Sequence, residues 1–61
     1  MEKNVNRDQF CILVSRALTE MLETNITEVE VSEQLLLIET GQEPTKLVIG
    51  VFIKKYISYE N

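Results

Sequence analysis

Near the amino end, apolar residues recur at steps of three and four, the spacing of one face of a helix. These residues are Phe10, Leu13, Val14, Ala17, Leu18 and Met21. Asn6 stands where a helix N-cap is expected, and Gln9 follows three residues later, as in a capping box. Thr24 and Asn25 can stop the helix, because asparagine tolerates the left-handed backbone conformation. The pattern therefore predicts an α-helix over about residues 6–24.

After this helix, apolar and polar residues alternate, so the pattern repeats every two residues. One side holds Thr27, Val29 and Val31, and the other holds Glu28, Glu30 and Ser32. Such alternation is typical of a half-buried strand. Residues 35–38 are apolar throughout, as in a strand covered on both sides. We expect strand structure over about residues 27–40, as one bulged strand or as two, followed by a hairpin loop at residues 41–45, which contain Gly41 and Pro44.

The carboxyl-terminal segment, residues 46–58, is rich in β-branched and aromatic side chains, which favour a second strand. The alternative is a helix that starts after Pro44. Its apolar stripe would comprise Leu47, Val48, Val51, Phe52 and Tyr56. Gly50 would cost that helix about 1 kcal/mol, so we favour the strand. The expected fold class is α+β, with the N-terminal helix packed on an antiparallel β-hairpin or short meander.

Both faces of the expected hairpin are apolar, and one helix can cover only one of them. The residues expected on the uncovered face are Leu36, Ile38, Val48, Phe52 and Tyr56. A two-stranded ribbon with an apolar face and two open edges is unstable by itself. We therefore expect a homodimer in which a two-fold axis covers this face.

Length and composition limit the chemistry that the chain can perform. Residues 1–61 suffice for one small domain, and a chain of this size buries only about 60% of its unfolded surface. With one cysteine and no histidine, it can form no internal disulfide, histidine-based catalytic triad or ordinary zinc site. Cys11 lies on the apolar arc of the expected helix and is interpreted as a buried structural thiol. We expect no enzyme activity, cofactor or metal.

The hydropathy pattern also bears on location. The longest apolar run is the seven residues 47–53, against the roughly 20 that a membrane-spanning helix needs. No export signal is visible at the amino end, so we expect a cytoplasmic protein that does not bind a membrane.

Charge is distributed unevenly around a net value of −4. Residues 17–45 contain seven glutamates and neither lysine nor arginine. This segment is either a solubilising surface or a docking surface for a partner protein with a basic patch. The candidate partner-binding residues are Glu20, Glu23, Glu28 and Glu30. Nucleic-acid binding is disfavoured, because the six cations are scattered along the chain.

These features together predict a small acidic homodimeric protein-interaction module. In size, acidity and lack of catalytic residues, the chain resembles small phage- or mobile-element-encoded proteins that bind a host enzyme or defence factor. That resemblance implies an inhibitor. The alternative is a small-ligand-binding or regulatory protein with a pocket at the seam between helix and sheet or between two protomers.

Overall fold

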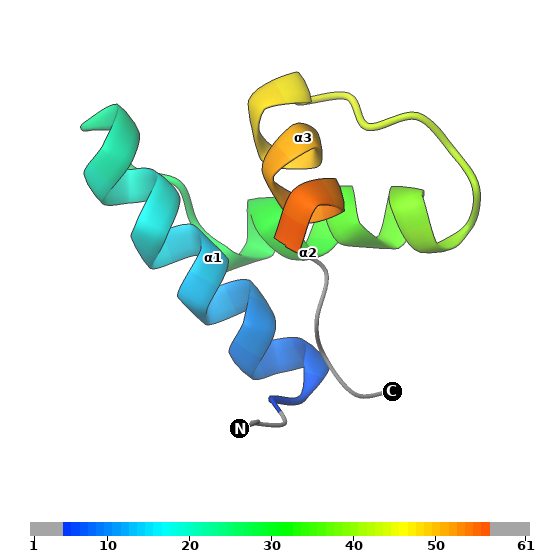
Figure 1. The fold of residues 1–61 in the computed structure, drawn as a ribbon, viewed down its shortest axis with the longest axis horizontal. Coiled ribbons are helices and arrows are strands. Elements are labelled where there is room, and N and C mark those ends of the chain that lie inside the picture. The colour runs from blue at the N-terminus through cyan, green and yellow to red at the C-terminus, as the bar shows by residue number, and fades with distance from the viewer. Residues whose placement is uncertain (1–4, 57–61) are drawn as a thin grey trace.

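The computed structural model describes residues 5–56, which form three helices (Figure 1). They are α1 (Arg7–Leu22), α2 (Glu28–Glu39) and α3 (Leu47–Tyr56). No strand occurs among the described residues, so the expected α+β fold with a β-hairpin is wrong. The N-terminal helix is confirmed, and both segments that were expected to form strands are helical instead.

Helix α1 begins at the cap that the sequence predicted. The side-chain oxygen of Asn6 accepts a hydrogen bond from the backbone N–H of Gln9 at 2.8 Å, which satisfies one free donor of the first turn. The helix ends slightly earlier than expected, because Glu23 rather than Asn25 adopts the left-handed conformation, with φ of 54°.

Helix α2 replaces the strand that was expected over residues 27–40. Thr27 caps it in a full capping box: its hydroxyl accepts from the Glu30 N–H at 3.2 Å, and the Glu30 carboxylate accepts from the Thr27 N–H at 2.9 Å. Its buried residues are Val31, Gln34 and Leu35, which follow the period of a helix. The alternation at residues 27–32 is too short to outweigh this cap and the good helix formers Glu, Gln and Leu.

The expected hairpin loop is instead the end of α2 and its connection to α3. Gly41 adopts φ of 79°, a conformation that glycine reaches without steric cost. Its N–H donates to the carbonyl of Ile38 at 3.1 Å, and the N–H of Gln42 donates to the carbonyl of Leu37 at 2.8 Å. This pair of bonds is a Schellman motif, which satisfies the last carbonyls of a helix.

Helix α3 replaces the second expected strand, and the alternative helical interpretation is correct over Leu47–Tyr56. Residues 57 and 58, the end of the expected strand, lie outside the described residues. Gly50, which argued against a helix, is buried against the ring of Pro44. A Cβ atom at position 50 would lie 2.4 Å from Cγ of Pro44 and 2.5 Å from its Cβ. The close approach of proline to α3 therefore requires glycine and accounts for its presence within the helix.

Helix α2 is the centre of the fold, because both α1 and α3 pack mainly against it (Figure 1). The apolar core draws on all three helices. It consists of Phe10, Cys11, Val14, Leu18, Val31, Leu35, Ile49 and Ile53. Among the described residues, no helix has both the length and the hydrophobicity that crossing a membrane would require.

Side-chain hydrogen bonds hold the two connections. The buried side chain of Gln34 accepts from the N–H groups of Thr45 and Lys46 at 2.9 and 3.0 Å, just ahead of α3, and donates to the Thr45 hydroxyl at 2.8 Å. The Thr19 hydroxyl both donates to and accepts from the backbone of Ile26, at 3.1 and 3.0 Å. These bonds fix the ends of the two connections, and so help to set the positions of α1 and α3 on α2 and the space between α1 and α3.

Candidate functional site

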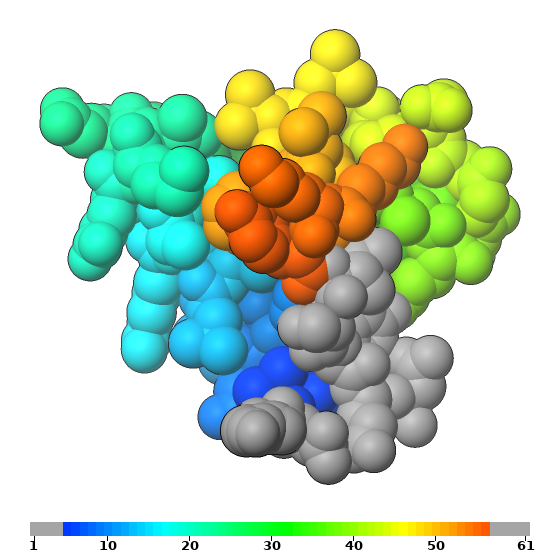
Figure 2. All heavy atoms as spheres, in the orientation of Figure 1, coloured from blue at the N-terminus to red at the C-terminus, as the bar shows by residue number. Residues whose placement is uncertain are grey.

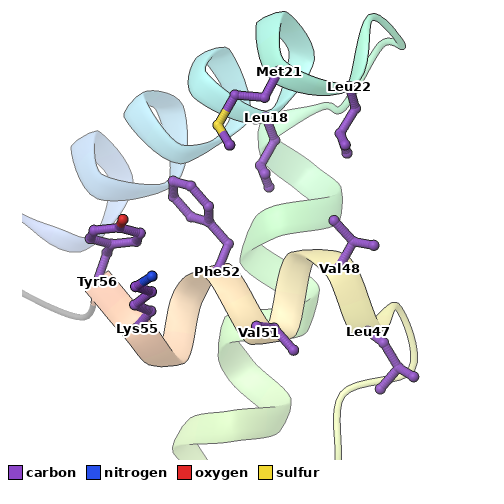
Figure 3. A pocket seen from close by; sticks show the side chains of 9 residues that line it. All are labelled: Leu18, Met21, Leu22, Leu47, Val48, Val51, Phe52, Lys55 and Tyr56. Atoms are coloured by element: carbon purple, nitrogen blue, oxygen red, sulfur yellow. The ribbon is translucent and has the colours of Figure 1, made fainter.

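An apolar groove of about 420 Å³ lies between the carboxyl-terminal part of α1 and one side of α3 (Figure 3). It exists because both helices pack on α2 and make few contacts with each other. The lining residues are Leu18, Met21, Leu22, Leu47, Val48, Val51, Phe52, Lys55 and Tyr56. Atoms of α1 and α3 border each other on one face of the molecule in the space-filling view (Figure 2).

The groove has a partly buried floor and strongly exposed sides. Leu18 is fully buried beneath it and Phe52 is half-buried. Met21 on α1 is 66% exposed, and Leu47 and Val51 on α3 are 68% and 62% exposed. Large apolar side chains exposed together in this way, rather than singly, mark association surfaces in soluble proteins.

The two helices that form the walls of the groove, α1 and α3, run in opposite directions (Figure 3). Leu22, at the end of α1, lies near Val48 at the start of α3, whereas Tyr56 lies at the opposite end of the groove. At the Tyr56 end, the Phe52 and Tyr56 rings are 4.7 Å apart, and the Lys55 ammonium lies 5.7 Å from the centre of the Tyr56 ring. Among the described residues of the lining, Lys55 is the one that carries a charge.

The groove contains three of the five residues expected at a dimer interface. Val48, Phe52 and Tyr56 line it, although the hairpin face that suggested them does not exist. The other two lie on α2 outside the groove lining: Leu36 is exposed and Ile38 packs against the core. Sequence reasoning missed the other six lining residues as members of one site, although the helical stripe of the alternative interpretation contained Leu47 and Val51.

The four glutamates expected to bind a partner lie in different surroundings. Glu20 and Glu28 border a polar depression near the connection of α1 and α2, which also contains Arg16. Glu23 is exposed at the end of α1. Glu30 is engaged within the fold, both in the Thr27 capping box and in an ion pair with Lys46.

Neighbouring groups stabilise the charged form of Glu30. The hydrogen bond from the Lys46 ammonium, with those from Thr27, lowers the pKa of the Glu30 carboxyl from 4.5 to about 2. The carboxylate therefore stays charged across the neutral range and joins the start of α2 to the start of α3. Its geometry indicates a structural role.

Cys11 lies on α1 near Arg7 and Ser32, and its side chain is buried, as expected for a structural thiol. Burial raises the pKa of the thiol, against opposing effects of the Arg7 charge and a hydrogen bond with Ser32. A neutral, enclosed thiol is a poor nucleophile, because the thiolate is the reactive form. Among residues 5–56, no group of three or more cysteine, aspartate and glutamate side chains is arranged to hold a metal ion.

No protein-family model, curated protein or solved structure matches this chain.

Proposed function

We propose that this chain is a protein-interaction module that works by association through the apolar groove between α1 and α3. The observation that carries the proposal is the set of exposed apolar side chains that face this groove from both helices. Covering them with another apolar surface removes them from water, at about 25 cal/mol for each Å² buried. The open, two-walled shape suits an amphipathic helix, which places its apolar face into such grooves.

The alternative expected from the sequence, a small-ligand binder, has less support. A volume of about 420 Å³ is within the range of ligand pockets, which are about 300–1,000 Å³. Such pockets also carry several polar groups that converge on the ligand and fix its orientation. Here the side-chain polar groups that the described residues contribute to the lining are the Lys55 ammonium and the Tyr56 hydroxyl, both from the same end of α3.

Two valines provide a matched test of the proposal. Val51 lines the groove and Val29 lies on α2 outside its lining, yet each is 62% exposed. A photo-crosslinking amino acid placed at either position should leave the core intact. In cells that express the protein, we expect a discrete adduct with a polypeptide from position 51 and none from position 29. Met21→Lys, on the opposite wall, should abolish this adduct. The absence of an adduct at position 51, or equal adducts at both positions, would refute the proposal.

The inhibitor role expected from size and acidity stays a prediction. An inhibitor of this kind would act by covering part of its target, so the same groove variants would remove inhibition.

A further inference from the structure

We propose that the occupant of the groove is a second copy of this chain, packed groove to groove about a two-fold axis. This step rests on the proposal that the groove binds a polypeptide. Three features of the described residues support it: the apolar area left open, the shape of its two walls, and the charges at its two ends.

The groove is a large open apolar surface. The side chains that line it from the two helices and are 42–68% exposed are Met21, Leu22, Leu47, Val48, Val51 and Tyr56. Soluble monomers rarely expose contiguous apolar patches larger than a few hundred Å². A stable interface buries about 800 Å² of total surface on each partner, somewhat more than half of it apolar. These six side chains can therefore form the apolar centre of such an interface.

A ridge of side chains lies beside the groove on the same surface. Leu47 and Val51 lie one turn apart on α3 and are the most exposed apolar residues of that helix, so they form a ridge beside the groove (Figure 3). Side-chain ridges of one helix pack into grooves formed by others. In an isologous pair each copy offers both parts, so the ridge of each can enter the groove of the other.

The charges at the groove ends are also complementary. Glu23 is the exposed C-cap of α1, directly after the lining residue Leu22, and the last turn of α1 contains no basic residue. Carboxylates at this position are unfavourable, because the end of a helix already carries partial negative charge. The last turn of α3 carries Lys54 and Lys55. Since the two helices run in opposite directions, the acidic and basic ends lie diagonally across the groove.

A two-fold axis perpendicular to this diagonal, in the plane of the interface, exchanges the two ends. It places the basic end of α3 in each copy over Glu23 of the other, twice per dimer. The pairing supplies each α1 with the cations that its own last turn lacks. The same arrangement brings the two sets of apolar side chains into contact between the charged ends.

The first experiment measures mass by sedimentation equilibrium across a concentration series. We expect the wild type at twice the 7.1 kDa chain mass, 14.2 kDa, at micromolar concentration. Val51→Glu should raise the dissociation constant by more than about a hundredfold, because it places an unpaired charge in an apolar interface. Val29→Glu, at the same exposure outside the groove, should leave the dimer unchanged. If Val51→Glu loses its helical circular dichroism, Met21→Lys serves as the groove variant.

The second experiment tests the arrangement by charge exchange. Glu23→Lys, and separately Lys55→Glu, should each raise the dissociation constant by about tenfold, because like charges then meet at both ends. An equal mixture of the two variants should form a heterodimer as tight as the wild-type dimer. A mixture that associates no better than either variant alone would overturn the two-fold arrangement.

The two proposals fail in different ways. A 7.1 kDa wild type at micromolar concentration, or a dimer that Val29→Glu weakens as much as Val51→Glu does, overturns the second copy as occupant. A monomer that still gives an adduct of another mass from position 51 leaves the proposed function standing with a different partner. Loss of both the dimer and the adduct overturns both.

Discussion

Gly50→Ala gives the sharpest test of the packing between α3 and the connection that precedes it. In an ordinary helix interior, alanine is more favourable than glycine by about 1 kcal/mol. Considered from the sequence alone, the substitution should therefore stabilise α3. In the folded protein the new Cβ would lie 2.4 and 2.5 Å from two ring carbons of Pro44.

The size of the destabilisation by Gly50→Ala depends on how far the Pro44 ring and α3 can move apart. Carbon atoms in contact prefer separations of about 3.5–4.0 Å, so the ring and the helix must separate by about 1 Å. The proline ring is rigid and its φ is fixed, and α3 is held by the buried Ile49 and Ile53. Overpacking of this kind costs about 1–3 kcal/mol, and we expect the upper part of that range. After the gain in helix propensity, Gly50→Ala should destabilise the fold by about 2 kcal/mol, or roughly 10 °C in melting temperature.

A double-mutant cycle isolates the contact. Pro44→Ala removes the ring atoms that the new Cβ would meet, so Gly50→Ala should be neutral or stabilising in that background. Free energies of unfolding would be measured for the four proteins by urea denaturation at one protein concentration, followed by circular dichroism. A stabilisation of about 1 kcal/mol by Gly50→Ala in the wild-type background would refute the reasoning.

Three further predictions concern groups inside the fold. Gln34→Leu leaves the N–H groups of Thr45 and Lys46 unpaired and should lower the unfolding free energy by about 1–3 kcal/mol in urea denaturation; a change below about 0.5 kcal/mol would contradict the capping role. Because the pKa of Glu30 is lowered from 4.5 to about 2, its ion pair should stabilise the fold fully above pH 4.5 and progressively less as pH falls towards 2. A carboxyl titration by NMR should show a midpoint near 2 for Glu30, and a midpoint near 4.5 would be inconsistent with the ion pair. Cys11 should react with a thiol reagent at neutral pH only as fast as the protein opens, since burial raises its pKa, whereas stoichiometric labelling within seconds would contradict its enclosure.

Local sequence was sufficient for the first helix. The spacing of apolar residues from Phe10 to Met21 spans three turns, and the Asn6 cap marks the start, so both signals agree on one structure. The same holds for the burial of Cys11, whose place on the apolar arc follows from helical geometry.

In residues 27–40 local signals conflicted. The alternation of valine and glutamate favours a strand, whereas the spacing of Thr27 and Glu30 favours a capping box. The capping box prevailed because, once formed, it nucleates a helix that buries Val31 and Leu35 on one side against α1 and α3. The weight of that burial depends on the neighbouring helices, so it could not be judged from the segment alone.

In residues 46–58 the deciding contact was not local at all. Glycine lowers helix propensity, and the sequence contains no sign that Pro44 folds back onto Gly50. Only the tertiary structure shows that position 50 must lack a side chain. Gly50 lowers the helix propensity of α3, but the packing of α3 against Pro44 requires it.

The candidate site divides in the same way. The sequence determined which residues of a helical α3 would form its apolar stripe, and that glutamates would cluster before residue 46. The tertiary structure decided that α1 and α3 pack on α2 with few contacts between them, which leaves the groove open. A groove is a property of the distance between two helices, and that distance is set here by contacts made with a third.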